Sequence, residues 1–479
     1  MQQILHRHNH HLDKPKEECG VFGAFTQDKH AAGITYNALI ALQHRGQESA
    51  GIAALDGNAI GVHKDTGLVS EVFPSAQCLP TGHAAIGHVR YSTTGGNVAA
   101  NAQPFVVEYL KGRLAAAHNG NVVNTAQIKK RLQEYGSSFL ASSDSEIIAT
   151  LIAYEALKAQ RIEDAVAAAA AQLIGAFSMV ILSSQNKLIA LRDGSGFRPL
   201  CIGKGPNGYA VASESCAFDS TGYAFLRDIA PGEMVVIDAT GIIETRQVLP
   251  GRQMGMCIFE YVYFARPDSI LDGLSVYEAR HNMGRILAQE TPVEADMVCG
   301  VPDSGMEAAA GFAAGSGIPL LQGFVKNRYI GRSFIFPTQS QRQSAIRLKL
   351  NPLAVTVKGK RVVLVDDSIV RGNTSRLIIQ AMRDAGAAQV HMRVSSPPFL
   401  HVCHFGTDID DEHTLVANRL DIGQIADEIG ADSLGYLSVG GLQQACSGAK
   451  LPFCTGCFNG NYPVEVGSHH KALFEEGKA

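Results

Sequence analysis

The sequence predicts two consecutive domains of different fold class, a layered α+β domain followed by a domain built on a parallel α/β sheet. A chain of 479 residues is too long for one hydrophobic core and suits two domains of ordinary size. In the first half, short apolar stretches alternate with glycine-containing turns. In the second half, strand-like, loop and helix-like segments follow one another in turn. The pattern changes within PGRQMG, so we expect the domains to span residues 19–250 and 251–479.

Strands dominate the first half. The apolar segments that predict strands are residues 20–25, 51–55, 84–92, 114–120, 177–184, 188–193 and 209–214. Two amphipathic segments predict helices at 128–135 and 147–157, and the alanine-rich run 165–173 is a third helix by propensity. Runs of strands with segregated helices favour a layered α+β domain.

The second half alternates strands and helices. Residues 295–301 predict a strand, which leads through a loop to an alanine-rich helix and then to the apolar segment 318–324. Residues 361–367 predict another strand, followed by a loop, a helix at 376–386 and a strand at 390–396. This alternation is typical of a parallel α/β sheet, whose ligands bind at the carboxyl ends of the strands.

Composition excludes several classes of protein. Charged residues make up 18% of the chain and the net charge is -4, so we expect no bulk attraction to nucleic acid or to an anionic membrane. No apolar run approaches the roughly 20 residues that cross a bilayer. Residues 1–18 lack the apolar core of a secretory signal, which favours a cytoplasmic protein. The histidines of this leader could bind a metal, but a solvated leader is favoured; they are His6, His8, His10 and His11.

Four segments of the first half carry residues suited to cleaving an amide. Cys19 opens a strand in EECGVFG, and HVRYSTTG contains Arg90. LAAAHNGNV contains Asn119 and Gly120, and SSDSE contains Asp144. Amide cleavage needs a nucleophile, an oxyanion binder and groups that hold the charged ends of the substrate. Taken singly, such a cysteine is more often a small buried hydrophobe, and Asn-Gly is more often a hairpin turn.

Together these segments resemble the class II glutamine amidotransferases, which are N-terminal nucleophile hydrolases with an αββα sandwich fold. The resemblance implies that Cys19 is the nucleophile and that its own α-amine, which titrates near 7.7–8.0, is the base. It further implies that Asn119 and Gly120 form the oxyanion hole. Arg90 would bind the carboxylate of glutamine and Asp144 its ammonium. LQHRGQESAG also matches the family, and we expect its Arg45 to be structural.

The position of Cys19 departs from this family, in which the cysteine is the first residue of the mature chain. Eighteen residues precede Cys19, so removal of Met1 cannot expose its amine. If the mechanism holds, residues 1–18 are a propeptide that must be cut away.

The most specific string of the chain is RVVLVDDSIVRGNTS. An apolar strand ends in Asp366 and Asp367, and a loop with glycine and hydroxyl residues then opens a helix. A helix N-terminus offers free N–H groups and partial positive charge, which suit a phosphate. The string is neither a G-x4-G-K-[ST] phosphate loop nor a G-x-G-x-x-G dinucleotide fingerprint. The alternative is an acid pair that only caps a helix.

This string resembles the phosphoribosyl pyrophosphate motif of the type I phosphoribosyltransferases. The resemblance implies that Asp366 and Asp367 hold the ribose and that the 5′-phosphate is bound by the loop residues Arg371, Gly372, Asn373, Thr374 and Ser375. VPDSG matches the pyrophosphate loop of that family, which often contains a non-proline cis peptide and would supply Ser304. A Mg²⁺ ion would be held by Ser304, Asp366 and Asp367. A basic stretch that begins at Lys326 resembles the flexible loop that closes over the substrate.

Cys454 and Cys457 form a C-x2-C pair, and Cys257 and Cys403 lie elsewhere in the second half. Four thiolates can hold zinc or an iron–sulfur cluster, and the residues alone do not separate the two. A resemblance to cluster-containing relatives implies a structural or oxygen-sensing [4Fe–4S] cluster. The remaining cysteines are expected to be ordinary core or surface residues, namely Cys78, Cys201, Cys216, Cys299 and Cys446.

The order of the two domains is similar to that of the amidophosphoribosyltransferase family, in its iron–sulfur-containing branch. The resemblance implies that ammonia released from glutamine reaches phosphoribosyl pyrophosphate through a dry channel and yields 5-phosphoribosylamine for purine synthesis. It also implies a homotetramer or homodimer inhibited by purine nucleotides. Two alternatives are a non-catalytic sensor of phosphoribosyl pyrophosphate and a different glutamine amidotransferase. The complete glutaminase set argues against the first, and the motifs of the second domain argue against the other.

Overall fold

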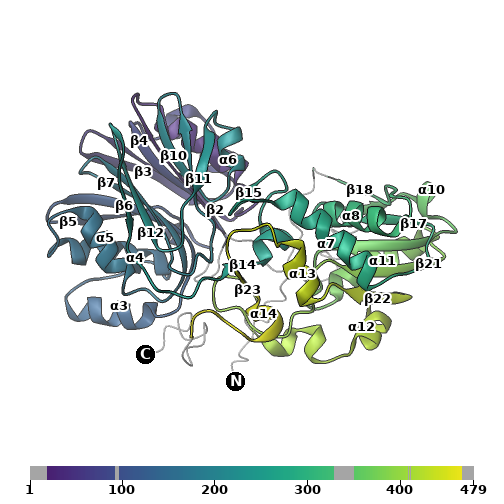
Figure 1. Ribbon diagram of the computed structural model, residues 1–479. Coiled ribbons are helices and arrows are strands. Elements are labelled where there is room, and N and C mark those ends of the chain that lie inside the picture. Colours follow the sequence, from purple (N-terminus) through teal and green to yellow (C-terminus); the bar gives the residue numbers. More distant parts are fainter. Residues whose placement is uncertain are drawn as a thin grey trace, which may run out of the picture.

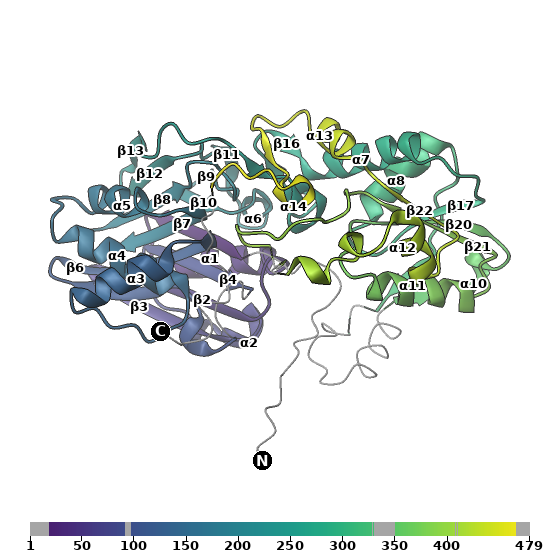
Figure 2. The ribbon, with the colours of Figure 1, turned by 90° about the horizontal axis from the view of Figure 1, so that it is seen from below.

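The computed structural model describes residues 19–91, 97–327, 329, 350–407, 409 and 411–465. The expected propeptide, including its histidines, and nearly all of the basic stretch after Lys326 lie outside the described residues. The chain forms two lobes, and the C-terminal segment returns to the region between them (Figures 1 and 2).

The first lobe contains two stacked antiparallel sheets. The seven-stranded sheet has the order β11 (Ala224–Asp228), β9 (Cys201–Gly205), β10 (Gly208–Ala212), β1 (Gly20–Thr26), β4 (Ala84–Arg90), β2 (Ser49–Asp56) and β3 (Ala59–Thr66). The six-stranded sheet has the order β13 (Gly241–Gln247), β12 (Glu233–Asp238), β8 (Lys187–Arg192), β7 (Gly175–Ser183), β6 (Gly112–Val122) and β5 (Phe105–Tyr109).

Helices cover the outer face of each sheet. The seven-stranded sheet packs against α1 (Ala31–Ala41), α2 (Val69–Val72) and α6 (Cys216–Asp219). The six-stranded sheet packs against α3 (Thr125–Glu134), α4 (Asp144–Ala156) and α5 (Ile162–Ala170). A third core, with Val21, Ile86 and Val180, lies between the sheets. The predicted αββα sandwich is therefore confirmed. Two short 3-10 turns, η1 (Ala76–Cys78) and η2 (Ala99–Asn101), lie in the connections.

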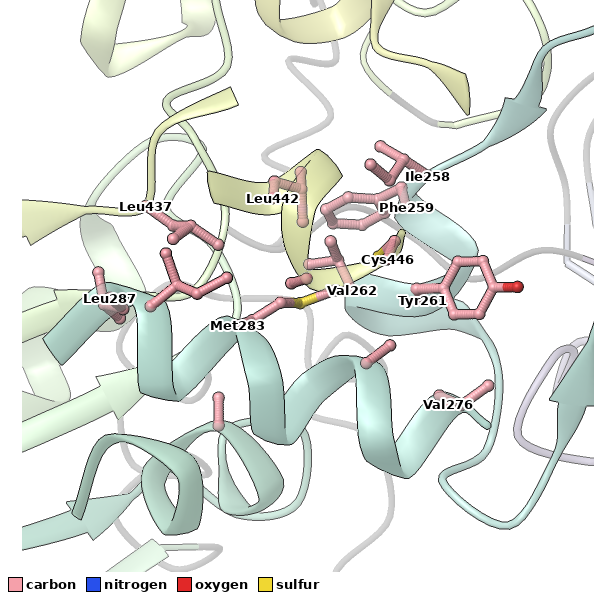
Figure 3. Close-up of a cluster of buried hydrophobic side chains, with 14 of the residues drawn as sticks. Ile258, Phe259, Tyr261, Val262, Val276, Met283, Leu287, Leu437, Leu442 and Cys446 are labelled. Carbon is pink, nitrogen blue, oxygen red and sulfur yellow. The ribbon is translucent and has the colours of Figure 1, made fainter. Parts of the chain in front are cut away.

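The second lobe is built on a parallel sheet of the order β17 (Met297–Gly300), β20 (Arg361–Asp366), β21 (Gln389–Val394) and β22 (Ser433–Tyr436). Side chains of β20 alternate between two cores. One core contains α7 (Val276–Glu290), α8 (Met306–Ser316), α13 (Val439–Ala445) and the π-helix η3 (Glu260–Phe264), and Figure 3 shows part of it. The other contains α11 (Asn373–Asp384) and α12 (Ile422–Ile429).

The apolar segment 318–324 takes only a small part in the parallel sheet. Leu320 makes only an isolated bridge with Val298 of the parallel sheet. The strand that follows, β18 (Phe324–Lys326), pairs instead with β19 (Leu350–Pro352) in a separate antiparallel ribbon. Leu320 and Leu321 are also partly exposed, so this apolar segment is not a buried inner strand. Short turns complete the lobe: α10 (Ala354–Val357), η5 (Glu412–Thr414) and η6 (Val416–Asn418).

Small elements between the lobes join distant parts of the chain (Figure 1). The strand β14 (Met256–Cys257) pairs in parallel with β23 (Phe453–Cys454), which is followed by α14 (Gly456–Asn459). The hairpin β15 (Ile270–Leu271) and β16 (Leu274–Ser275) places Asp272 against the first lobe, where Arg192 donates two hydrogen bonds to its carboxylate. No helix among the described residues is long and apolar enough to cross a membrane.

Candidate active sites

Cys19 lies directly before β1 and is buried, with 5% of its surface exposed. Its Sγ donates to the carbonyl oxygen of Tyr91 at 3.3 Å, and its own carbonyl oxygen accepts a hydrogen bond from Arg45. Tyr91 follows Arg90, the last residue of β4, and β4 is the direct neighbour of β1. The antiparallel pairing of these two strands therefore brings Cys19 and Arg90 to the same end of the sandwich.

Asn119 and Gly120 lie in β6, in the other sheet. The side chain of Asn119 is fully buried, yet neither Nδ2 nor Oδ1 has a hydrogen-bond partner among the described residues. Buried amides are normally satisfied, so an unsatisfied one suggests that a ligand completes it. Gly120 has φ +138°, and a Cβ there would lie 2.1 Å from the carbonyl oxygen of Ala176. Only glycine fits this position.

Asp144 is the first residue of α4, where Ser143 caps the helix by accepting from the Ser145 N–H. Its Oδ2 lies 3.3 Å from Nε2 of His118 and accepts from the Val122 N–H at 3.4 Å. Burial is the largest single influence and raises the pKa of Asp144, but the charge and hydrogen bond of His118, the Val122 N–H and the charge of Arg90 together outweigh it. The pKa is therefore below its ordinary value, and the carboxylate is held ionised.

Sequence reasoning missed His118, although it directly precedes Asn119 in HNGN. Its Nδ1 lies 3.0 Å from the hydroxyl of Ser145, so the ring bridges β6 and the first turn of α4. His88 of β4 contacts the backbone of His118, with its Nε2 3.2 Å from the His118 carbonyl oxygen. Burial, together with the neighbouring His118 and Arg90, lowers the pKa of His88 well below its ordinary value. These contacts connect the strands that carry the predicted glutaminase residues.

The acid pair of the second lobe lies at the carboxyl end of β20. Asp366 and Asp367 are buried, and Ser304 Oγ donates to Asp367 Oδ1 at 2.5 Å. Ser304 comes from the loop after β17, which is next to β20 in the sheet. The loop packs closely, because a Cβ on Gly305 would lie 2.3 Å from the carbonyl oxygen of Val365. The peptide bond between Pro302 and Asp303 is cis, as expected for this loop.

The loop that follows the acid pair turns into α11 at Gly372, which has φ +86°. Its N-cap residue is a glycine, which has no side chain to cap the first turn, and the N-terminus of the helix carries partial positive charge. Ser375 is buried, Arg371 and Thr374 are half-buried, and Asn373 is exposed. Lys326 forms an ion pair with Asp303, which directly precedes Ser304. The structure thus brings together two buried carboxylates, the loop that opens α11, and a lysine.

The four cysteines predicted to bind a metal come from three separate segments that meet between the lobes. Cys257 and Cys454 are register partners in β14 and β23. Cys457 follows in α14, and its carbonyl oxygen accepts from the N–H groups of Leu400 and His401, close to Cys403. Burial raises the pKa of the Cys457 thiol, and the neighbouring Cys403, Cys257 and Cys454 raise it further. The four thiols are therefore neighbours.

No three His, Cys, Asp or Glu side chains among the described residues converge tightly enough to hold a single metal ion. Four neighbouring thiols are a donor set that suits either zinc or an iron–sulfur cluster. All ten cysteines lie in the described part of the chain, and none of them forms a disulfide.

Known proteins share both halves of this arrangement. A glutamine amidotransferase domain family matches residues 88–220, and a phosphoribosyl transferase domain family matches residues 268–396. The amidophosphoribosyltransferase of Synechocystis sp. is 48% identical over 464 residues, which cover 95% of this chain and 93% of that protein. That of Bacillus subtilis is 45% identical, covering 94% of this chain and 95% of its own.

The chain belongs to the amidophosphoribosyltransferase family.

Two solved structures agree with this membership. A structure described as the allosteric regulatory enzyme of purine biosynthesis is 44% identical, with a TM-score of 0.87 over 95% of this chain and 99% of its own. A B. subtilis glutamine phosphoribosylpyrophosphate amidotransferase, complexed with ADP and GMP, is also 44% identical, with a TM-score of 0.86 over 94% and 99%. As an amidophosphoribosyltransferase, the chain uses glutamine and phosphoribosyl pyrophosphate to make 5-phosphoribosylamine, the first committed step of purine synthesis. The predicted function is confirmed.

Proposed function

We propose that residues 19–250 carry the glutaminase reaction and residues 251–479 the phosphoribosyl transfer, with Cys19 as the glutaminase nucleophile. The observation that carries this assignment is the buried side chain of Asn119, which has no hydrogen-bond partner among the residues that the structure describes. An amide donor in this state is ready to bind the oxyanion of a tetrahedral intermediate without reorganisation.

The first half-reaction follows from this assignment. Once residues 1–18 are removed, the α-amine of Cys19 takes the proton of the thiol, and Sγ attacks the carboxamide carbon of glutamine. Asn119 Nδ2 and the Gly120 N–H stabilise the oxyanion, while Arg90 and Asp144 bind the carboxylate and ammonium of the substrate. Collapse of the intermediate releases ammonia and leaves a thioester, which water hydrolyses to glutamate.

The second half-reaction takes place at the carboxyl end of the parallel sheet. The N–H groups and hydroxyls of residues 371–375 bind the 5′-phosphate, since a helix N-terminus favours an anion. Asp366 and Asp367 accept hydrogen bonds from the two ribose hydroxyls, and Lys326 neutralises phosphate charge. Ammonia then attacks the anomeric carbon and displaces pyrophosphate. Only unprotonated ammonia is a nucleophile, so we infer that it passes between the two sites through a channel shielded from water.

Two inorganic groups belong to this proposal. Ser304, Asp366 and Asp367 present the hard oxygen ligands that Mg²⁺ prefers, and an ion held by them would neutralise the charge of the leaving pyrophosphate. Cys257, Cys403, Cys454 and Cys457 hold a [4Fe–4S] cluster, which assigns the chain to the iron–sulfur-containing branch. None of these cysteines is among the proposed catalytic residues, so the role of the cluster is structural or oxygen-sensing.

The wider setting is inferred from the relatives. The B. subtilis structure contains ADP and GMP, which supports inhibition of this enzyme by purine nucleotides. We further propose that the enzyme is cytoplasmic and assembles as a homotetramer or homodimer.

The decisive experiment is Cys19→Ala, assayed for phosphoribosylamine synthesis from glutamine and from ammonium. We expect glutamine-dependent synthesis to fall by about three orders of magnitude or more, as for loss of a nucleophile, while ammonium-dependent synthesis stays within about twofold. Cys201→Ala, which removes another buried thiol of the same lobe, is the matched control and should retain both activities. Retention of glutamine-dependent synthesis by Cys19→Ala would contradict the proposed nucleophile.

A further inference from the structure

A fully buried ionic network lies at the boundary between the two lobes and contacts the proposed nucleophile. Arg45, from the loop after α1, donates through Nε to the carbonyl oxygen of Cys19 at 2.9 Å. Its two terminal nitrogens donate to both carboxylate oxygens of Glu260, at 3.0 and 2.9 Å. Nη1 also donates to Glu214 at 2.6 Å. None of these three charged side chains is exposed.

Glu260 belongs to the second lobe. It opens the π-helix η3, whose Tyr261 and Val262 pack in the core shared with α7 and α13 (Figure 3). Arg280 of α7 holds the same turn by donating to the carbonyl oxygens of Tyr261 and Ala265, at 2.8 and 2.7 Å. The carboxylate of Glu260 is therefore held rigidly by the fold of the phosphoribosyltransferase lobe, although it points into the glutaminase lobe.

An N-terminal nucleophile has an unusual need for such a contact. A chain end frays unless it is tied down, and the first residue of a mature chain has no preceding peptide bond to hold it. The carbonyl group of Cys19 is then the nearest backbone group by which its amine and Sγ can be oriented. Arg45 holds that carbonyl, and Glu260 holds the guanidinium in the plane in which Nε reaches it.

The proposed function makes Cys19 the nucleophile. Resting on that function, we propose that Glu260 is a positioning residue of the glutaminase site, supplied by the other lobe and acting through Arg45. The glutaminase half is incomplete without the second lobe, because its nucleophile is aligned by a carboxylate that the second lobe provides. Glu214 alone cannot replace Glu260, because it contacts only Nη1 and is shared with His44, Ser269 and the Arg266 N–H.

A second interdomain ion pair offers a matched control. Asp272, also from the second lobe, accepts two hydrogen bonds from Arg192, which is fully buried in the first. Neither residue contacts Cys19 in any described interaction. Glu260→Gln and Asp272→Asn each remove one carboxylate charge that pairs with a buried arginine of the first lobe. Only Glu260→Gln changes the partner of Arg45, the arginine that contacts the nucleophile.

The test compares the two variants, in the full chain, for kcat and KM with glutamine and with ammonium, and for the rate at which iodoacetamide alkylates Cys19. For Glu260→Gln we expect kcat with glutamine to fall about 10- to 100-fold, as for misplacement of a reacting group by about an ångström. KM for glutamine should change less than about threefold, because Arg90 and Asp144 are untouched. Cys19 alkylation should slow in parallel, while ammonium-dependent kcat stays within about twofold. Asp272→Asn should leave the ratio of the two activities unchanged.

The proposal would be overturned if Glu260→Gln and the unchanged enzyme had equal ratios of glutamine- to ammonium-dependent kcat. It would also be overturned if Asp272→Asn lowered this ratio as much as Glu260→Gln does. If Glu260→Gln does not fold, Glu260→Gln with Arg198→Met balances the buried charge, because Arg198 is the other arginine that donates to Glu260. The same expectations apply to this pair. Cys19→Ala is assayed alongside: if it retains glutamine use, the proposed nucleophile is wrong, whereas a normal Glu260→Gln beside an inactive Cys19→Ala overturns only the positioning role.

Discussion

The ring of His118 lies against the carboxylate of Asp144, with Nε2 3.3 Å from Oδ2. This contact joins β6, which carries the proposed oxyanion hole, to the first turn of α4. Burial alone raises the pKa of Asp144, and His118 is the largest of the influences that lower it. The ionised state that can bind the ammonium group of glutamine therefore depends on a residue that does not contact the substrate in our proposal.

The first prediction follows from this pair. In the unchanged enzyme the lowered pKa keeps Asp144 ionised above its ordinary value of about 4, so KM for glutamine should not rise until the pH falls below that value. In His118→Asn the effect of burial gains weight, the pKa of Asp144 rises, and the increase in KM should begin at a higher pH than in the unchanged enzyme. The measurement is KM for glutamine between about pH 5 and pH 8, where most carboxylates do not titrate, with ammonium-dependent activity recorded at each pH.

The matched control is His63→Asn, which replaces another histidine of the same lobe whose ring contacts Phe73 and the Val72 carbonyl. Its KM profile should follow that of the unchanged enzyme. His88 contacts the carbonyl oxygen of His118, and burial lowers its pKa well below its ordinary value, which favours its neutral form. A His118→Asn profile that coincides with the control would show that His118 does not set the charge of Asp144.

The second prediction concerns the acid pair. Asp366→Asn combined with Asp367→Asn keeps side-chain size but removes the charges proposed to hold the ribose hydroxyls and Mg²⁺. Binding of phosphoribosyl pyrophosphate should weaken by about 3 kcal/mol or more, the scale of losing two charge-assisted hydrogen bonds. Isothermal calorimetry with Mg²⁺ present measures this loss.

Asp296→Asn with Asp432→Asn is the control for the acid pair. These carboxylates precede β17 and β22, so they lie at the amino ends of the same sheet, away from the proposed site. This double variant should bind phosphoribosyl pyrophosphate as the unchanged enzyme does. Unchanged affinity in the Asp366 and Asp367 variant would remove both residues from the site.

Local sequence patterns predicted much of the fold because the relevant signals are short-range. The continuous apolar run of β20 and the polar residues at its end indicate both a buried parallel strand and the place of its ligand. Exposed edge strands gave weaker signals: β3 carries His63, Lys64 and Asp65 and is absent from the predicted strands, although it pairs with β2 along its whole length. Its stability comes from that pairing, which no local pattern reveals.

Contacts between residues far apart in the sequence could not be predicted from local patterns. Arg45 and Glu260 are separated by 215 positions, and neither lies in a pattern that names the other as its partner. Arg45 was expected to be structural, and the structure shows that it donates a hydrogen bond to the carbonyl oxygen of Cys19. The four cysteines illustrate the same limit, since only Cys454 and Cys457 are close in sequence, and a resemblance was needed to add the other two.

The third prediction concerns the metal. Anaerobically purified protein should be brown and contain about four irons per chain, as for a [4Fe–4S] cluster. Replacing Cys403 with Ser should abolish the iron and lower thermal stability more than it lowers the activity of the remaining folded protein, because cluster binding is coupled to folding. Cys446→Ala, which removes a buried thiol from the same lobe, should retain full iron. Stoichiometric zinc without iron would contradict the cluster assignment.

The last prediction concerns the segment before Cys19. While the bond between Glu18 and Cys19 is intact, the nitrogen of Cys19 is an amide and cannot act as a base, so glutaminase activity should be absent. Cleavage creates the amine and activates the thiol in one step. We expect cleavage to be autocatalytic: the thiol of Cys19 attacks the carbonyl of Glu18, and water hydrolyses the resulting thioester.

Cys19→Ala should therefore retain residues 1–18, whereas a shortened chain in which Met directly precedes Cys19 should gain glutaminase activity once that Met is removed. Cys201→Ala, with its thiol buried in the same lobe, should be processed normally. N-terminal sequencing and intact mass, measured beside glutaminase activity, report the outcome. Active enzyme whose chain still begins at Met1 would mean that a group other than the α-amine of Cys19 takes the proton of the thiol.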